Sequence, residues 1–374
     1  MNSRDVFVRL IGFLFLFSMC KSKTSLNLHI VQPHVNYDSI KIVKDVDTLK
    51  LNLDSLTYNN IRSFNYFESN NKGLISLYDK QSNNILIYDI GSQLVINRIN
   101  LRLALPGNKV KSKTSVYAFS TDSLLVISHY KVFFLDGKGK VLDSIKYKDP
   151  ETAIGQGYIA NNNPPVIKDG KLYIKSDPFG SNEVSDQQLM YEIDLKSKTV
   201  KSIVTLPDIY RNLRFSLLFL DSYYCFDGGK LVFSFPADSN VYVHDFNNYT
   251  TGYSSKSSYQ KHPIEEVSKD ELEEMEKSYY TRDSYSSIFY DQFNHRYLRL
   301  FSKGMPLSSF DGKKLEKEQS ILILDASFNI IGETSFEKEL TLNNMFIDRN
   351  GAIFIRCNPE NEETIMFLKY KYST

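Results

Sequence analysis

The stretch Ile85-Leu86-Ile87-Tyr88-Asp89 is a short apolar run that closes on an acidic residue, and the pattern recurs along the chain. The other copies span residues 132–136, 190–194, 241–245 and 321–325, each ending on Asp, and residues 365–369, which end on Lys. Short runs rich in β-branched and aromatic residues are typical of strands. Their spacing fits the blades of a β-propeller, which take roughly 40–50 residues each before loop insertions are added.

Each copy lies within a unit of four strands. A short turn such as Gly91-Ser92 leads from the copy to an outer strand, and one further strand precedes it, such as Leu74 to Tyr78. In front of these lies an innermost strand that ends at a turn such as Asp169-Gly170. The sequence therefore predicts an all-β fold of six four-stranded antiparallel blades.

The two ends of the repeat indicate how the ring closes. The last unit stops at Thr374 after its third strand, whereas Asp47 to Leu53 is an alternating strand that belongs to no unit. Pairing these two strands removes two exposed sheet edges. We therefore predict that the N-terminal strand closes the last blade.

The expected connections fall into two classes of very different length. Turns from the first to the second strand of a blade, and from the third to the fourth, are short. The other class holds the long segments, which are residues 102–115, 148–165, 177–188, 207–215, 256–285 and 303–318. Since binding residues concentrate on long loops of rigid scaffolds, this loop-rich face is the expected functional face. Ser268 to Glu271 forms a capping box, which predicts a helix there that serves as a lid or as a packed strut.

The N-terminus has the features of an export signal. Arg4 and Arg9 precede an apolar run at residues 10–19, which is too short to cross a membrane as a helix. Cys20 follows and resembles the lipid-attachment cysteine of bacterial lipoproteins, although Met19 replaces the usual small residue. Plain secretion and an uncleaved anchor are the alternatives.

These features divide the chain into a signal peptide (residues 1–20), a tether (21–39) and a propeller (40–374). No acidic run follows Cys20, which favours an outer-membrane lipoprotein that faces the periplasm over one secreted or displayed at the cell surface.

Composition and motifs exclude several classes of function. The net charge is +1, so no basic field points to nucleic acid, and the absence of Trp argues against Trp-Asp and sialidase propellers. The six His and three Cys residues show no metal-ligand spacing, and no nucleophile-elbow or phosphate-loop motif occurs. We therefore expect no metal and no cofactor. The recurring Asp residues each precede a tight turn, where Asp accepts hydrogen bonds from its own backbone, so we interpret them as structural.

Arginines beside aromatic residues are the candidate ligand-binding groups. Arg binds carboxylates or phosphates through a bidentate fork, and aromatic rings suit sugars and peptides, although Arg also links neighbouring blades. The candidates are Arg62, Tyr210, Arg211, Arg214, Tyr290 and Arg299.

The stretch from Tyr285 to Arg299, together with Cys20 and Asn83 to Asp89, resembles a family of uncharacterised propeller lipoproteins of Bacteroidetes-type bacteria known as domain of unknown function 4221. Asp348 to Ile355 also resembles blades of the NHL and TolB types. The resemblance implies a propeller in the cell envelope and carries no catalytic residue with it.

We therefore expect a monomeric envelope protein, held at the membrane by its lipid, that binds a peptide, a glycan or a partner protein without catalysis. The alternative is a metal-assisted hydrolase or lyase of the lactonase-like propeller class, with ligands at the axial channel.

Overall fold

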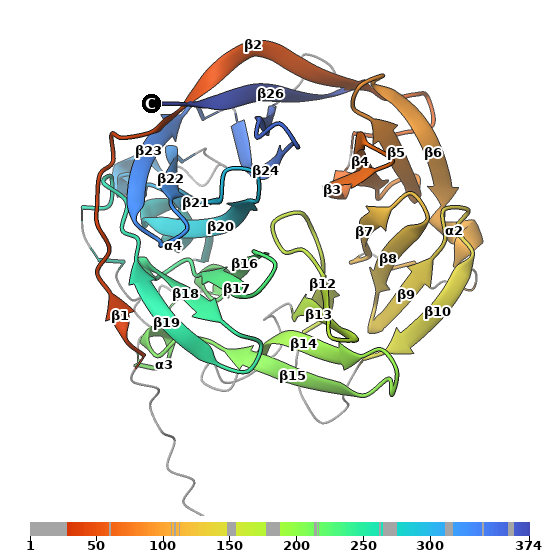
Figure 1. The fold of residues 1–374 in the computed structure, drawn as a ribbon, viewed down its shortest axis with the longest axis horizontal. Helices are drawn as coiled ribbons and strands as arrows, with labels where there is room; N and C mark the ends of the chain where they lie inside the picture. The colour runs from red at the N-terminus through yellow and green to blue at the C-terminus, as the bar shows by residue number, and fades with distance from the viewer. Residues whose placement is uncertain are drawn as a thin grey trace, which may run out of the picture.

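The computed structural model describes residues 28–374 except 60, 106, 108, 109, 112, 148–154, 177–187, 213, 214, 216, 262, 265–274, 311–316, 339 and 358–362. It is a ring of six antiparallel blades around a central axis, as predicted (Figure 1). None of the helices within these residues is long and apolar enough to cross a membrane.

The six blades follow one another around the ring in chain order. From the axis outward, the first three consist of β3 (Ile61–Ser69), β4 (Lys72–Asp79), β5 (Asn84–Asp89) and β6 (Leu94–Asn100); β7 (Ser115–Ser120), β8 (Ser123–Ser128), β9 (Lys131–Leu135) and β10 (Val141–Lys146); and β12 (Val166–Lys168), β13 (Lys171–Ser176), β14 (Gln188–Asp194) and β15 (Val200–Thr205).

The last three consist of β16 (Tyr223–Phe226), β17 (Leu231–Ser234), β18 (Asn240–His244) and β19 (Tyr249–Ser254); β20 (Ser284–Asp291), β21 (Arg296–Ser302), β22 (Gln319–Leu324) and β23 (Ile330–Phe336); and β24 (Leu340–Ile347), β25 (Ile353–Cys357), β26 (Thr364–Ser373) and β2 (Lys41–Asn52).

Shorter elements lie between these strands. β1 (Ile30–Val31) and β11 (Gly157–Tyr158) add to blades four and three, and the helices are α2 (Leu101–Ala104), α3 (Ile209–Asn212), α4 (Met275–Thr281), η2 (Leu217–Phe219) and η4 (Leu307–Ser309). The capping box at Ser268 to Glu271 lies outside the described residues.

The predicted closure of the ring is confirmed, and the closing strand is longer than expected. β2 runs antiparallel to β26 from Lys41 opposite Ser373 to Asn52 opposite Thr364, with a bulge between Lys44 and Thr48. Leu51 on this strand is fully buried, in an apolar cluster that joins blades six and one. Closure therefore combines backbone pairing with burial of side chains.

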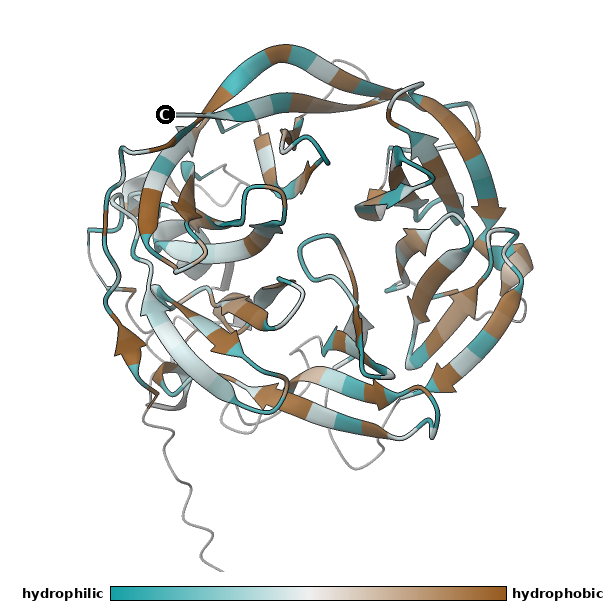
Figure 2. Cartoon of the chain, in the orientation of Figure 1, coloured by the Kyte–Doolittle hydropathy of each residue, from teal (hydrophilic) through white to brown (hydrophobic). Residues whose placement is uncertain are grey.

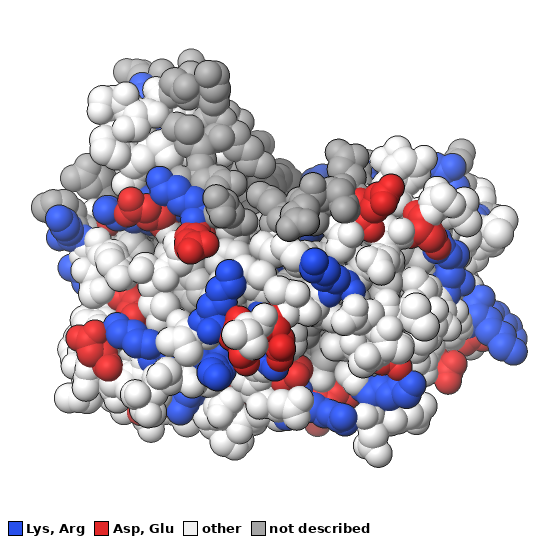
Figure 3. Space-filling view, turned by 90° about the horizontal axis from the view of Figure 1, so that it is seen from above, with Lys and Arg blue, Asp and Glu red and all other residues white. Residues whose placement is uncertain are grey.

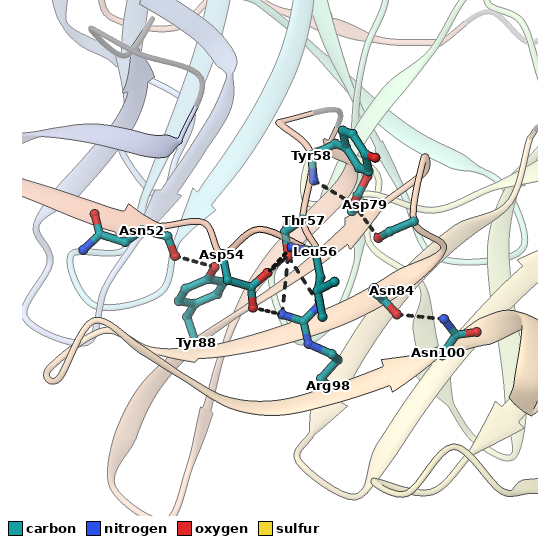
Figure 4. Close-up of polar contacts among 11 residues, drawn as sticks. Asn52, Asp54, Leu56, Thr57, Tyr58, Asp79, Asn84, Tyr88, Arg98 and Asn100 are labelled. Atoms are coloured by element: carbon teal, nitrogen blue, oxygen red, sulfur yellow. Dashed lines mark hydrogen bonds and ion pairs between the residues drawn. The ribbon is translucent and has the colours of Figure 1, made fainter.

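The chain that leaves β2 is fixed to blade one by polar contacts (Figure 4). Asp54 forms an ion pair with Arg98 of β6 and accepts a hydrogen bond from the Thr57 hydroxyl at 2.8 Å. The Tyr88 hydroxyl donates to the Asn52 carbonyl at 2.9 Å. These contacts hold the closing strand in register where it passes to the first blade.

Apolar side chains fill the spaces between neighbouring blades. Figure 2 shows hydrophobic residues throughout the middle strands, whereas hydrophobic and hydrophilic residues alternate along outer strands such as β2 and β6. One cluster joins Phe67 and Ile85 of blade one to Val116 and Phe133 of blade two. Middle strands are covered on both faces, which is why their runs read as continuous apolar sequence.

The recurring aspartates stabilise turns, as the sequence indicated. The carboxylate of Asp89 accepts from the backbone N–H groups of Gly91 and Ser92, and that of Asp194 accepts from Lys196 and Ser197. Asp136, Asp245 and Asp325 accept backbone hydrogen bonds in the same way. These carboxylates bind the turns that follow them, which is the structural role predicted from sequence.

An N-terminal belt, residues 28–40, runs around the outside of blades four and five before it enters β2 (Figure 1). Ile30 and Val31 pair in parallel with Gly252 and Tyr253 of β19. Farther along, the backbone of Ile330 in β23 bonds to the belt on both sides, through the His34 carbonyl and the Asn36 amide. Residues 28–39 were assigned to the tether from sequence, and here they pair with the propeller.

The two faces of the disc differ as the sequence predicted. The first and second strands of each blade are joined by short turns, such as residues 70–71 and 121–122. The opposite face carries the connections 101–114, 147–165, 206–222 and 255–283. We call the first the short-turn face and the second the loop-rich face. Figure 3 shows acidic and basic side chains interspersed over the side of the disc, in keeping with the near-zero net charge.

Candidate functional site

The described part of the connection between β10 and β12 projects from blade three toward the axis of the ring (Figure 1). Its Asn161 side chain donates to the Met345 carbonyl of blade six, on the opposite side of the ring. Asn162 donates to the Ser287 hydroxyl of blade five at 2.9 Å, and the Tyr224 hydroxyl of blade four donates to the Pro164 carbonyl at 2.7 Å. This channel plug, residues 157–165, therefore covers the channel from the loop-rich side.

Beneath the plug lies a cavity of about 210 Å³, which we call the axial cup. Its rim carries Phe226 and Ile347, at the ends of β16 and β24, and Gln292 and Phe293, in the turn after β20. Because innermost strands end at the short turns, the cup opens on the short-turn face. The site was expected on the loop-rich face, parts of which lie outside the described residues.

Aromatic rings dominate the lining of the cup. They come from five of the six innermost strands and from one turn: Tyr66, Tyr117, Phe226, Phe289, Tyr290, Phe293 and Phe346. The remaining lining residues are Asn161 and Pro164 of the plug, Cys225, Ile288, Gln292 and Ile347. Among the described residues that line the cup, none is Asp, Glu, Lys, Arg or His. The cup is therefore a small, uncharged, largely aromatic recess.

The phenol of Tyr117 is a partly buried polar group in the lining. Burial raises its pKa to about 12, and its hydroxyl has no hydrogen-bond partner among the described residues. The Cys225 thiol of blade four also lines the cup, and burial raises its pKa well above the ordinary value, which favours the protonated thiol. Neither group supplies a charge to the cup at neutral pH.

Of the candidate ligand-binding residues named from sequence, the structure brings Tyr290 to the cup. Its hydroxyl is 3.1 Å from Nδ1 of His295, and its ring lies beside that of Tyr297 at 5.0 Å between centroids. The side chains of Arg62 and Arg211, and all of Arg214 and Cys20, lie outside what the structure describes.

Arg299 and Tyr210 lie in the framework between blades. The Arg299 guanidinium is fully buried, lies 3.8 Å from the centroid of the Tyr285 ring, and donates to the carbonyls of Asp238, Ser239 and Ser255 and to two serine hydroxyls. The Tyr210 hydroxyl accepts from the backbone N–H of Ala237 in the same loop. Both side chains therefore fix residues 237–239 and do not line the cup.

His244 is also part of the framework. Its side chain is 2% exposed, and its Nδ1 accepts a hydrogen bond from the Phe246 amide at 3.0 Å, which places the ring proton on Nε2. Desolvation lowers its pKa to about 4. Among the described residues, no three His, Cys, Asp or Glu side chains come together in a group that could hold a metal ion.

Three larger recesses carry less chemistry. One of about 290 Å³ beside the belt includes Asp238, whose carboxylate already accepts from the Asn240 amide and the Tyr242 hydroxyl. A groove of about 540 Å³ between blades six and one is lined by turn residues such as Asp89 and Asp348, whose carboxylates already bind their own turns. In a recess of about 660 Å³ beside residues 303–309, the Lys317 ammonium already donates to the Tyr279 and Arg282 carbonyls, and Lys303 pairs with Glu318. The cup is therefore the candidate site.

Sequence reasoning identified Tyr290 and missed the rest of the cup. The other lining residues lie in innermost strands of separate blades, where an aromatic residue facing the axis looks the same as one facing a neighbouring blade. One signal was present: Asn161-Asn162-Asn163 followed by two prolines, in a long connection, is a run of polar side chains able to hold a loop by hydrogen bonds to other blades.

Comparisons with known proteins agree with the fold. A family model described as domain of unknown function (DUF4221) matches residues 39–335. A DUF4221 member from Bacteroides vulgatus has a crystal structure that is 22% identical and covers 91% of this chain and 100% of that chain, with a TM-score of 0.75. A Bacteroides fragilis protein classed as exported is 12% identical and covers 92% of this chain and 100% of that chain, with a TM-score of 0.57. No curated protein matches the sequence.

Proposed function

Because the chain belongs to the DUF4221 family, whose function is unknown, we propose a function from the site itself: the protein is a binding module of the cell envelope that holds an uncharged ligand group in the axial cup. The observation that carries this proposal is the lining, whose described residues include seven aromatic side chains and two amides and no charged group.

The lining selects against anionic ligands on physical grounds. An anion that enters a small aromatic recess loses its hydration and gains no opposite charge, which costs several kcal/mol in effective terms. An uncharged group gains about 25 cal/mol for each Å² of apolar surface removed from water. The cup therefore favours a neutral group with apolar surface over an anionic one.

The scaffold supports binding by a preformed site. Five inner strands and the plug hold the lining residues, and the plug is itself bonded to blades four, five and six. A rigid site needs little ordering when ligand arrives, which reduces the entropic cost of binding.

The proposed location is the outer membrane, on its periplasmic side, with Cys20 as the lipid-bearing residue. The apolar run at residues 10–19 and the structural likeness to an exported Bacteroides protein support export. The test is mass spectrometry of the mature N-terminus from a membrane fraction. A diacylglyceryl group on Cys20, with loss of membrane attachment in Cys20→Ser, is expected; an unmodified N-terminus in the soluble fraction would contradict lipidation.

The binding proposal is tested with matched neutral and charged probes. We expect thermal stabilisation of the protein by N-acetyl-tyrosinamide or by neutral methyl glycosides, and none by N-acetyl-tyrosine or glucose 6-phosphate. Phe293→Ala, on the rim, should remove the effect, whereas Leu307→Ala, an exposed residue of η4, should not. Stabilisation by the charged probes alone, or binding that survives Phe293→Ala, would refute the proposal.

Elemental analysis of the purified protein tests the lactonase-like alternative. A tightly bound metal at one equivalent would favour a metal-assisted hydrolase or lyase over the binding module.

A further inference from the structure

Three polar groups in the lining of the axial cup retain hydrogen-bonding capacity. The Tyr117 hydroxyl and the Gln292 amide have no partner among the described residues, and Asn161 uses its NH₂ group on the Met345 carbonyl while its own side-chain oxygen accepts no bond within that part of the chain. Tyr117 lies in blade two and Gln292 in blade five, on opposite sides of the ring, and Asn161 belongs to the plug. The free groups are thus distributed around the recess.

These groups discriminate between two kinds of uncharged occupant. A hydrocarbon side chain that fills the cup strips water from Tyr117 and Asn161 and returns no hydrogen bond to these two groups or to Gln292 at the exposed rim. A polyhydroxylated occupant replaces each lost water with a hydroxyl, which both donates and accepts. Since an unsatisfied buried polar group is strongly disfavoured, the free groups favour the polyhydroxylated occupant.

The aromatic residues point to a ring-shaped polyol. Aromatic faces carry partial negative charge, and the axial C–H bonds of a pyranose ring carry partial positive charge and form a flat apolar surface. A sugar ring thus presents apolar faces to Tyr and Phe side chains and hydroxyls to the amides and phenol. An open-chain polyol lacks the flat face, and a flat aromatic ring lacks the hydroxyls.

The size of the cup limits the occupant to one ring. Pockets for drug-sized ligands measure about 300–1,000 Å³. The cup has about 210 Å³, which is below this range. One pyranose ring fits this space, and the remainder of a longer chain must leave through the rim on the short-turn face.

We propose that the axial cup binds the terminal sugar ring of an uncharged glycan, with its hydroxyls bonded to Tyr117, Gln292 and Asn161. This inference rests on the proposed function and names its ligand class.

The experiment compares the methyl glycosides of glucose, galactose, mannose and N-acetylglucosamine with N-acetyl-phenylalaninamide, using titration calorimetry on the full chain and on three variants. Tyr117→Phe removes one hydroxyl and keeps the ring. We expect the Kd of the bound glycoside to rise about five-fold, which is the effect of one neutral hydrogen bond, and the Kd of the amide to stay equal or fall. Tyr259→Phe, the same change at an exposed position, should leave both unchanged. Gln292→Ala is a second variant at an exposed turn and should also weaken glycoside binding.

The outcomes separate this inference from the proposed function. The saccharide inference is wrong if the amide binds and no glycoside does. It is also wrong if a glycoside binds equally to the wild type, Tyr117→Phe and Gln292→Ala. In both cases the proposed function, binding of an uncharged group in the cup, still stands. If neither the amide nor any glycoside binds, both are wrong.

Discussion

Replacing His244 by Asn should remove a large part of the loss of stability between pH 8 and pH 5. In the folded protein desolvation lowers the pKa of His244 from 6.5 to about 4, so the unfolded state binds more protons in this range and stability falls as the pH falls. For these two pKa values, the preference of the unfolded state for the proton lowers the unfolding free energy by about 2 kcal/mol at pH 5 relative to pH 8. The loss reaches about 3.4 kcal/mol well below pH 4. With an unfolding entropy of about 2.1 cal/mol/K per residue, 2 kcal/mol corresponds to roughly 3 °C in Tm.

The structure explains why protonation is unfavourable. Nδ1 of His244 accepts a hydrogen bond from the Phe246 amide, and the ring packs edge-on against Tyr249 at 5.1 Å between centroids. Protonation of Nδ1 would break this hydrogen bond and leave a positive charge in an apolar site. The neighbouring Asp245 carboxylate opposes the shift and does not cancel it.

The assay is urea unfolding followed by circular dichroism at pH 8, 7, 6 and 5. The Oδ1 atom of Asn can accept the Phe246 bond without titrating, so His244→Asn should show a flatter pH dependence than the wild type. His244→Phe should be equally flat and less stable throughout, because it also loses the acceptor. A pH dependence of the same steepness in His244→Asn and the wild type would refute the reasoning.

Three further predictions concern the framework. Leu51→Ala in the closing strand should lower the unfolding free energy in urea by about 2–5 kcal/mol, as Leu→Ala changes at fully buried positions do. Val46→Ala on the same strand, where the side chain is 93% exposed, should lower it by less than about 0.5 kcal/mol. Equal effects would contradict closure by side-chain burial. Arg299→Met should lower the unfolding free energy by about 3–5 kcal/mol, since three carbonyls and two hydroxyls lose their donor, and an unchanged stability would show that these groups find other partners. Removing residues 28–36, which pair with β19 and β23, should speed hydrogen exchange at Ile330 and Gly252 while Leu86 in blade one stays protected; uniform protection would show that the belt contributes nothing locally.

The blade pattern could be predicted from sequence because each third strand is covered on both faces. Ile85 to Tyr88 and Ile321 to Leu324 are almost fully buried, so their continuous apolar runs stand out against the alternating outer strands. The aspartates that follow them also have a local explanation in the turns. Local signals of this kind need no knowledge of distant contacts.

The belt, the plug and the buried arginine depend on contacts between distant segments. β1 has two residues and pairs in parallel with a strand more than two hundred positions away, which no periodicity reveals. Arg299 was assigned to ligand binding because its neighbours are aromatic. Its position in β21, a strand buried on both faces, places the guanidinium among the carbonyls of residues 238 and 239 instead.

The pairing of β2 with β26 has a consequence for the order in which the protein is made. Lys41 is synthesised long before its partner Ser373. The first long strand must therefore remain unpaired until β26 has been made, and a chain that stalls between the two presents an open strand edge at each end. Only a chain that contains both strands can complete the ring, so products that end before β26 are expected to aggregate or to be degraded.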